Sequence, residues 1–287
     1  MQSIYKSEAG AKKVLNQYRH FLEKWPVPKE HLKVPTREGE TFVTASGSYS
    51  TPPLVLFHGA MTNSIIWIKD IETWSRFFRV YAVDVIGEPG LSAPSRPPVN
   101  SDAYALWIDD ILDHFALRSA SFVGASLGGW LALDYATRRS NRIDKVVVMC
   151  PAGVGKQRIG FFLKAMFLLM MGNHGKQKMQ DLVFGKQAVN KTAEFRFFLE
   201  YMSTIQKHVR PRIGKLRVFS DEDLNKLAMP LLAIVGAEDV IFDSLETKER
   251  LEKCGQNANV HYLPKAGHSI VNQTETILEF LREGKSD

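Results

Sequence analysis

The chain has few cysteines and no long apolar run, and each shortage excludes a class of protein. It holds two cysteines, Cys150 and Cys254, among 287 residues. One possible pair in a chain of this size is typical of a reducing compartment, so we expect a cytoplasmic protein with both thiols buried as small apolar side chains. The most apolar segment, 161–171, contains Lys164 and is shorter than the roughly 20 residues that cross a bilayer. We therefore expect no integral membrane segment.

Several other signals are missing as well. Residues 1–21 mix charged and apolar side chains without the uninterrupted apolar stretch of a secretory signal, so we expect no leader peptide and a helix within 1–30. The sequence shows no internal repeat, no H-E-x-x-H spacing of a zinc site and no glycine-rich phosphate loop. These absences argue against a zinc enzyme and against a nucleotide-binding protein.

Positive charge is present but gathers in one part of the chain. The net charge is +6, and residues 151–229 contain 14 lysines and arginines against 6 acidic residues. A basic segment can bind an anionic surface or an acidic substrate. No nucleic-acid motif accompanies the charge, so we interpret it as a solvated outer face of helices and expect no nucleic-acid partner.

Short apolar segments alternate with helical ones over most of the chain. Continuous runs rich in Val, Ile and Leu predict strands buried on both faces of a mainly parallel sheet, and alternation with helices predicts an α/β fold. Two earlier segments, 31–36 and 40–45, flank a Glu-Gly turn and predict an antiparallel edge hairpin. The predicted buried strands are 53–58, 80–84, 120–123, 145–149 and 231–235, and the predicted helices are 65–77, 104–115, 127–138 and 245–254.

The alternation stops between residues 151 and 229. This segment contains apolar helical stretches and no convincing strand, and the strand pattern resumes at Pro230. An insertion of this kind is typical of a cap over the strand ends, where open α/β sheets bind ligands. We therefore expect a core of residues 1–150 and 230–287 and a helical cap of residues 151–229. Side chains that we expect to line the substrate site are Met61, Phe161, Phe162, Met166, Phe167 and Phe184.

The strongest local motif is Gly-Ala-Ser-Leu-Gly at residues 124–128, placed between a predicted strand and a predicted helix. G-x-S-x-G in this context is typical of a nucleophile elbow, a strained turn that projects the serine above the sheet. The positions two before and two after the serine must lack bulk, and Gly124 and Gly128 meet this need. Ser126 is therefore the predicted nucleophile.

A serine hydroxyl needs a base, and the base needs an orienting acid. His268 is the best of the eight histidines because its Gly-containing loop follows a late apolar strand, NVHYL at residues 259–263, and precedes the final helix. Three carboxylates compete for the third role after the strand at 231–235. We favour Asp239, in the turn behind that strand, over Glu238, which we expect to face solvent, and Asp243, which we expect to cap the next helix.

The oxyanion of acyl transfer needs two preorganised N–H donors. The amide of Leu127, at the helix start after the nucleophile, is one candidate. The other should come from His-Gly-Ala-Met at residues 58–61, with Ala60 favoured and Met61 as the alternative. We interpret His58 as a structural residue that holds this loop.

These motifs occur in a familiar order: FHGAMTNSIIW, AVDVIGEPGLS, GASLGGW, VGAEDVIFD and KAGHS. The chain resembles the α/β-hydrolase superfamily, and most closely the small bacterial carboxylesterases of the naproxen-esterase type. The similarity runs from about Pro52 to the C-terminus and includes VFSDEDL. In those esterases a glutamate can stand at the position of Asp239. The resemblance implies an α/β-hydrolase fold with a helical cap over a deep cleft, and hydrolysis of carboxylic esters without metal or cofactor.

Departures from related families narrow the prediction. Haloalkane dehalogenases and epoxide hydrolases carry an aspartate where this chain has Ser126, and prolyl iminopeptidases carry HGGPG where it has HGAMT. We therefore expect a small-molecule ester as substrate. The same three residues also serve thioesterases, perhydrolases and carbon–carbon bond hydrolases, and an α/β hydrolase without catalysis is a further alternative. The sequence predicts neither the natural substrate nor the oligomeric state.

Overall fold

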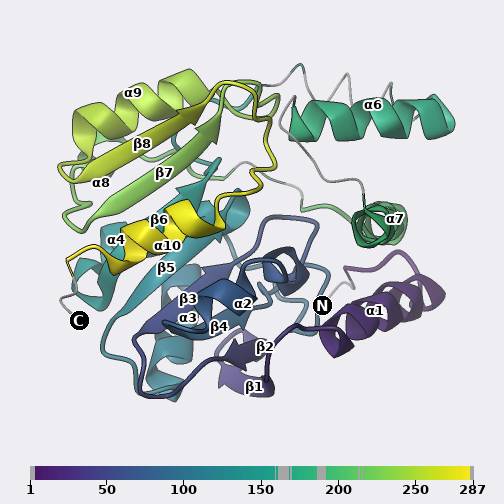
Figure 1. Ribbon diagram of the computed structural model, residues 1–287, viewed down its shortest axis with the longest axis horizontal. Coiled ribbons are helices and arrows are strands. Elements are labelled where there is room, and N and C mark those ends of the chain that lie inside the picture. The colour runs from purple at the N-terminus through teal and green to yellow at the C-terminus, as the bar shows by residue number, and fades with distance from the viewer. Residues whose placement is uncertain are drawn as a thin grey trace.

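The computed structural model describes residues 4–158, 160, 168, 170–185, 192–212, 214 and 216–284. Within this part of the chain, eight strands form one sheet in the order β1-β2-β4-β3-β5-β6-β7-β8 (Figure 1). Pairing is parallel from β4 to β8, whereas β2 pairs antiparallel with both β1 and β4. The strands are β1 (Glu30–Thr36), β2 (Gly39–Ser46), β3 (Pro53–Phe57), β4 (Arg79–Val83), β5 (Ala120–Ala125), β6 (Ile143–Met149), β7 (Leu231–Gly236) and β8 (Ala258–Leu263).

Each face of the sheet carries its own apolar core, because successive strand residues point to opposite faces. Val55 and Phe57 of β3 pack on one side with α3, α4 and α9. Leu54 and Leu56 pack on the other side with α1, α2, α7 and α10. The longer helices are α1 (Glu8–Glu23), α3 (Ala103–His114), α4 (Leu127–Arg138), α6 (Gly172–Phe184), α7 (Ala193–His208), α9 (Ser244–Cys254) and α10 (Thr274–Arg282). The short ones are η1 (Ser64–Trp67), α2 (Ile71–Trp74), η2 (Ser140–Arg142) and α8 (Asp221–Leu224).

This arrangement confirms the predicted fold class, a mainly parallel sheet flanked by helices. The edge hairpin is confirmed as β1 and β2, with His31 opposite Thr44. Both cysteines are free and buried, as expected. Across the described ranges, every helix is too short or too polar to pass through a bilayer.

The single helix predicted over residues 65–77 is wrong. The structure has two short pieces there, η1 and α2, with a break between Trp67 and Ile71. Contacts with α10 hold the broken form: Trp74 donates its ring N–H to the Thr274 carbonyl at 3.0 Å, and the Thr274 hydroxyl donates to Asp70 at 2.5 Å. Periodicity alone could not reveal these contacts, because tertiary partners override weak local propensity.

Helices α6 and α7 lie beside the sheet in Figure 1, and α1 runs next to α7. The pairing is made by aromatic side chains, with the rings of Phe21 and Tyr201 5.3 Å apart. The chain before α1 adds a bridge between Tyr5 and Val209. The N-terminal helix therefore packs on a helix of the predicted cap segment.

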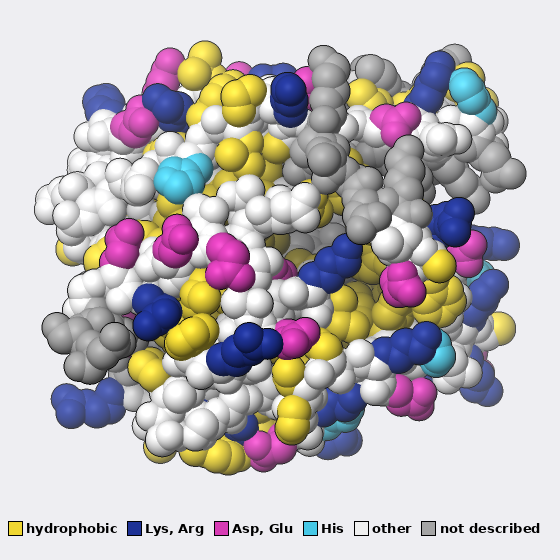
Figure 2. Space-filling model, viewed as in Figure 1, with side chains coloured by type: hydrophobic (Ala, Val, Ile, Leu, Met, Phe, Trp, Pro, Cys, Tyr) yellow, Lys and Arg dark blue, Asp and Glu magenta, His cyan; other side chains and the backbone are white. Residues whose placement is uncertain are grey.

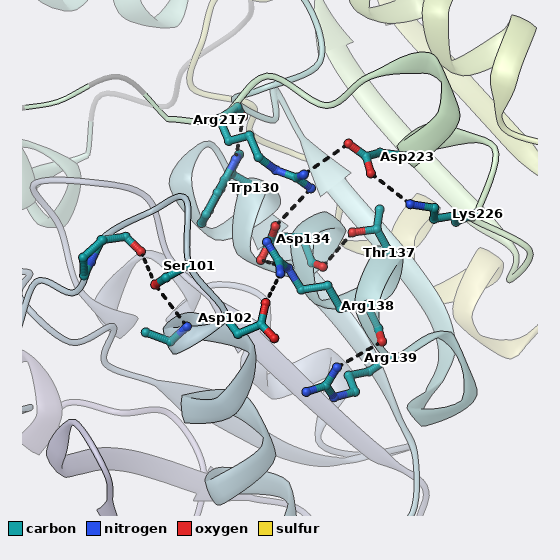
Figure 3. A network of polar contacts seen from close by, with 12 residues as sticks. Ser101, Asp102, Trp130, Asp134, Thr137, Arg138, Arg139, Arg217, Asp223 and Lys226 are labelled. Carbon is teal, nitrogen blue, oxygen red and sulfur yellow. Dashed lines mark hydrogen bonds and ion pairs between the residues drawn. The ribbon is translucent and has the colours of Figure 1, made fainter.

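The end of the predicted cap segment packs on the core through α4. Phe219 stacks on Trp130 at 6.2 Å, and the Trp130 ring N–H donates to the Arg217 carbonyl at 2.9 Å. Figure 3 shows the Arg217 side chain between Asp134 of α4 and Asp223 of α8, at 3.4 and 3.3 Å. The division into core and cap stays a prediction, and residues 216–229 contact the core directly.

Candidate active site

The elbow around Ser126 is a close-packed turn between β5 and α4. Ser126 has φ of 52° and ψ of −108°, a backbone conformation that is strained for any residue with a side chain. A Cβ on Gly124 would lie 2.3 Å from the Gly128 carbonyl oxygen, and one on Gly128 would lie 1.9 Å from that of Phe57. Only glycine allows this approach, so the two glycines place the serine at the end of the sheet.

The structure brings Ser126, His268 and Asp239 into one hydrogen-bonded chain. His268 Nε2 lies 3.0 Å from Ser126 Oγ, and His268 Nδ1 lies 2.9 Å from Asp239 Oδ2. An ionised carboxylate can only accept, so Nδ1 carries the ring proton of the neutral imidazole. Nε2 is then free to accept the hydroxyl proton of Ser126.

Asp239 is held as a buried carboxylate with a full set of donors. It is 1% exposed, and its Oδ1 accepts the amides of Ile241 at 2.7 Å and Phe242 at 3.1 Å. Burial alone would raise its pKa, but the bond to His268, the charge of His268 and these amides outweigh burial and hold the pKa below its ordinary value. Asp243, the rival carboxylate, accepts the Glu246 amide at the start of α9 instead.

The candidate oxyanion donors belong to two segments next to Ser126, the start of α4 and the loop after β3. The Leu127 amide is in the first turn of α4, where amides have no intrahelical acceptor. Gly59, next to Ala60, also lies close to Ser126, since a Cβ built on it would lie 3.5 Å from the Ser126 Cβ. The Met61 amide donates to Glu88 Oε2 at 2.8 Å, so it is already engaged. Ala60 is therefore the better candidate of the two that the sequence left open.

A model of the alpha/beta hydrolase family matches residues 54–279. The chain belongs to this family. Carboxylesterase YbfK of Bacillus subtilis is 29% identical over 280 residues that cover 93% of either chain. An uncharacterized carboxylesterase, nap, of the same species is 28% identical over 262 residues, which are 90% of this chain and 87% of the relative.

A solved structure agrees with the sequence relatives. The crystal structure of naproxen esterase (carboxylesterase NP) from Bacillus subtilis has a TM-score of 0.82 and 26% identity, covering 96% of this chain and 99% of that one. The resemblance to small bacterial carboxylesterases of the naproxen-esterase type is thus confirmed.

In this α/β hydrolase, the end of α6 holds the loop that carries His268. The Gly267 amide donates to the Phe184 carbonyl at 3.0 Å, and the Ser269 amide donates to that of Val183 at 2.9 Å. His268 lies between these two anchors. Gly185 follows with φ of 69°, and a Cβ there would lie 2.5 Å from the Gly267 nitrogen. Backbone hydrogen bonds therefore join the loop of residues 267–269, here called the base loop, to the end of α6 in the predicted cap segment.

The loop that carries Ala60 is held by α7 in a similar way. Asn63 donates its side-chain N–H groups to the Tyr201 hydroxyl and to the Pro89 carbonyl, both at 2.6 Å. Tyr201 comes from α7 and is fully buried. No local pattern around Tyr201 marks it for this role, because its partner lies 138 residues away.

Two buried polar residues complete the support of this loop. Glu88 holds the Met61 amide and is itself paired with Arg212 at 3.1 Å. His58 donates from Nδ1 to the Gly59 carbonyl at 2.8 Å and accepts the Val85 amide at Nε2 at 2.8 Å. Burial lowers the pKa of His58, in keeping with a neutral ring that only supports the loop. Sequence reasoning missed Glu88 and Tyr201.

Of the residues predicted to line the substrate site, Met61 and Phe184 belong to the described part of the chain. Met61 and Phe184 are half-buried; Met61 packs against the core face that carries α1 and α7, and the Phe184 ring meets that of Phe195 at 5.5 Å. The half-buried side chains of Phe198 and Met202 on α7 pack against the same core, although the sequence did not single them out. Figure 2 shows apolar side chains at the surface in the region of α1 and α7. The other residues predicted to line the site, Phe161, Phe162, Met166 and Phe167, lie outside the described residues.

Proposed function

We propose that the chain is a carboxylesterase that cleaves small-molecule esters through an acyl-enzyme on Ser126. The observation that carries this proposal is the hydrogen-bonded chain from Ser126 Oγ through His268 to Asp239. Membership of the α/β-hydrolase family and the carboxylesterase relatives support it. Binding alone does not require a nucleophile, a base and an orienting acid in register.

Acylation follows from the positions of the protons. His268 Nε2 takes the proton of Ser126 as Oγ attacks the ester carbonyl carbon, and the carbonyl π electrons move to oxygen. The amides of Leu127 and Ala60 are the proposed donors to that oxyanion. When the intermediate collapses, the C–O bond to the alcohol breaks and the leaving alkoxide takes the proton from His268.

Deacylation repeats these steps with water as the nucleophile. His268 removes a proton from water, the hydroxide oxygen adds to the acyl carbon, and Ser126 Oγ leaves with the proton that His268 returns. Asp239 keeps the ring proton on Nδ1 and stabilises the imidazolium that forms in each half-reaction. Every step uses side chains and amides of this chain.

The remaining parts of the proposal concern the setting of this chemistry. We propose residues 151–229 as the cap and residues 1–150 and 230–287 as the core, in a cytoplasmic protein without a nucleic-acid partner. This division is supported by the contacts of α6 and α7 with the two loops beside Ser126. The two buried free cysteines of the chain, Cys150 and Cys254, agree with a reducing compartment.

The test is the release of p-nitrophenol from acetate, butyrate and octanoate esters by the purified protein and by Ser126→Ala. We expect turnover by the wild type and a loss of about 10⁶-fold in the variant. The dependence on acyl length would report the depth of the pocket. Full activity in the variant would exclude Ser126 as the nucleophile.

A second readout separates a narrow-substrate hydrolase from a non-catalytic binder. A fluorophosphonate probe should label the wild type and not Ser126→Ala, because labelling needs an activated serine rather than a fitting ester. Absence of labelling together with absence of hydrolysis would overturn the proposal. Labelling without p-nitrophenol release would retain the serine chemistry and direct the search to thioesters, peracids or carbon–carbon bonds.

A further inference from the structure

Cys150 is a buried cysteine close to two of the proposed triad residues, Asp239 and His268. It follows β6, is 2% exposed and has φ of 41°, a left-handed conformation that is uncommon for a residue with a side chain. Its amide donates to the Ile234 carbonyl of β7 at 2.9 Å, which holds the backbone in place. Its Sγ lies 3.8 Å from the Gly267 carbonyl oxygen, beside the base loop.

Cys150 forms a compact group with two members of the triad. A ligand atom of Cys150, one of Asp239 and one of His268 all lie within 4.8 Å of one another. Among the residues that the structure describes, no other set of three such side chains meets this condition. Thiolate, carboxylate and imidazole are the ligands that Zn²⁺ takes in proteins, at about 2.3 Å for sulfur and about 2.0–2.2 Å for nitrogen and oxygen.

The spacing suits one cation. Tetrahedral bonds of these lengths separate the ligand atoms by about 3.3–3.6 Å. His268 Nδ1 and Asp239 Oδ2 start at 2.9 Å, so they need to part only slightly. The Ile241 and Phe242 amides bind Oδ1 and leave Oδ2 available. The His268 side chain is 12% exposed, so solvent reaches one member of the group.

We propose that Cys150, Asp239 and His268 form an inhibitory site for a thiophilic divalent cation such as Zn²⁺. Sγ, Oδ2 and Nδ1 bind the ion, and a water completes four ligands. The Cys150 thiol loses its proton to solvent. The ring proton of His268 leaves Nδ1 and the ring becomes the Nε2–H tautomer. One thiolate and one carboxylate balance the two positive charges, so the buried site stays neutral.

This tautomer explains why the ion would inhibit. Nε2 then carries a proton and points it at Ser126, so it cannot accept the hydroxyl proton. A base locked in the wrong tautomer loses most of its catalytic effect. Burial, and then the negative charge of Asp239, raises the pKa of the Cys150 thiol well above its ordinary value. The ion must therefore displace a firmly held proton, and it binds less tightly than it would to a preformed thiolate.

Inhibition rests on the proposed esterase function, whereas binding of the ion does not, so the first experiment measures binding. Co²⁺ is added to Ser126→Ala, which keeps all three ligands and cannot turn over. We expect the near-ultraviolet absorption of a cobalt–thiolate bond, its loss in Ser126→Ala/Cys150→Ala, and its retention in Ser126→Ala/Cys254→Ala, where the other buried cysteine is removed. Absence of the absorption from Ser126→Ala would overturn the proposal whether or not the protein is an esterase.

The second experiment measures inhibition by Zn²⁺ in p-nitrophenyl butyrate hydrolysis, relative to each variant's own metal-free rate. Wild type and Cys254→Ala should be inhibited equally and recover on addition of EDTA. Cys150→Ala and Cys150→Ser should need at least about tenfold more Zn²⁺, since weakening even an indirect metal contact has that effect. Equal inhibition of wild type and both Cys150 variants would place the ion elsewhere and overturn the proposal.

Discussion

The proposed nucleophile, Ser126, and the two loops beside it are held in place by different means. Ser126 sits on a turn whose shape is set by its own neighbours, since Gly124 packs on Gly128 and Gly128 packs on β3. The loops of Ala60 and His268 depend on distant partners. Tyr201 of α7 holds the first through Asn63, and the end of α6 holds the second through Gly267 and Ser269.

The difference separates two ways of losing activity. Damage to the elbow should destabilise the core, because its close contacts join the backbone of α4 to the backbones of β5 and β3. Damage to α6 or α7 should leave the sheet intact and shift the base or the oxyanion donors. Catalysis needs both regions in register to well under an ångström, and a displacement of about 1 Å can reduce turnover by about 100-fold.

The largest effect should come from breaking the hydrogen-bond chain that joins the two regions. Asp239→Asn keeps the size of the side chain but no longer holds the proton on His268 Nδ1. We expect kcat to fall by about 10⁴-fold with KM little changed, measured with p-nitrophenyl butyrate. Asp243→Asn is the matched control, because it changes the neighbouring acid that caps α9 and should retain activity within a few fold. Similar losses in both variants would disprove the assignment of Asp239.

A smaller effect should follow from pushing α6 away from the base loop. Gly185→Ala would place a Cβ 2.5 Å from the Gly267 nitrogen, so the loop of His268 must move. We expect kcat to fall by about 10- to 100-fold, with a smaller change in KM.

The control for this substitution comes from the same helix. Gly172 has a similar φ of 60° with open space around it, so Gly172→Ala carries the backbone strain without the collision. It should keep its kcat. Equal kcat values for the two variants would show that the end of α6 does not position His268.

Loosening the loop that carries Ala60 and Asn63 should reduce kcat less. Tyr201→Phe removes the hydroxyl that accepts from Asn63, and we expect kcat to fall by about 3- to 10-fold and stability by about 1 kcal/mol. Tyr135→Phe also removes a buried tyrosine hydrogen bond, to Asp109 on the opposite face of the sheet. It should lose similar stability in denaturant titrations and keep its kcat. If both variants lost turnover equally, the link through Asn63 would have no special role.

The smallest effect on catalysis should come from Asp70, which contacts the start of α10 beyond the base loop. Burial raises the pKa of Asp70 to about 6, from an ordinary value near 3.8. The folded state thus disfavours the charged form, and this penalty is full above pH 6, shrinks as the pH falls and vanishes below about pH 4.

Asp70→Asn should therefore stabilise the protein by about 1–2 kcal/mol at pH 7.5, a value reduced for partial exposure. The gain should disappear at pH 4, and kcat at pH 7.5 should stay unchanged. Urea titrations of both proteins at the two pH values measure the difference. A gain that did not depend on pH would show that the charge of Asp70 is not its cause.

The sequence alone predicted the parts of this protein that local physics controls. Buried strands show as apolar runs, α4 spans its predicted residues without error, and the glycines around Ser126 mark a turn that no bulkier residue allows. The order of Ser126, Asp239 and His268 along the chain was also visible, because each follows a strand and strand ends meet at one edge of a parallel sheet.

Tertiary structure decided how those residues are supported. The bonds from Met61 to Glu88 and from Asn63 to Tyr201 join residues 27 and 138 positions apart. The break at residues 68–70 depends on Thr274, 200 or more positions away. Glu88 lies in a segment that resembles the family, AVDVIGEPGLS, but nothing in that segment indicates its partner, since a hydrogen bond between distant segments needs only that folding brings them together. The sequence thus determined which side chains are proposed to react, and the contacts of α6 and α7 determined where the loops of His268 and Ala60 lie.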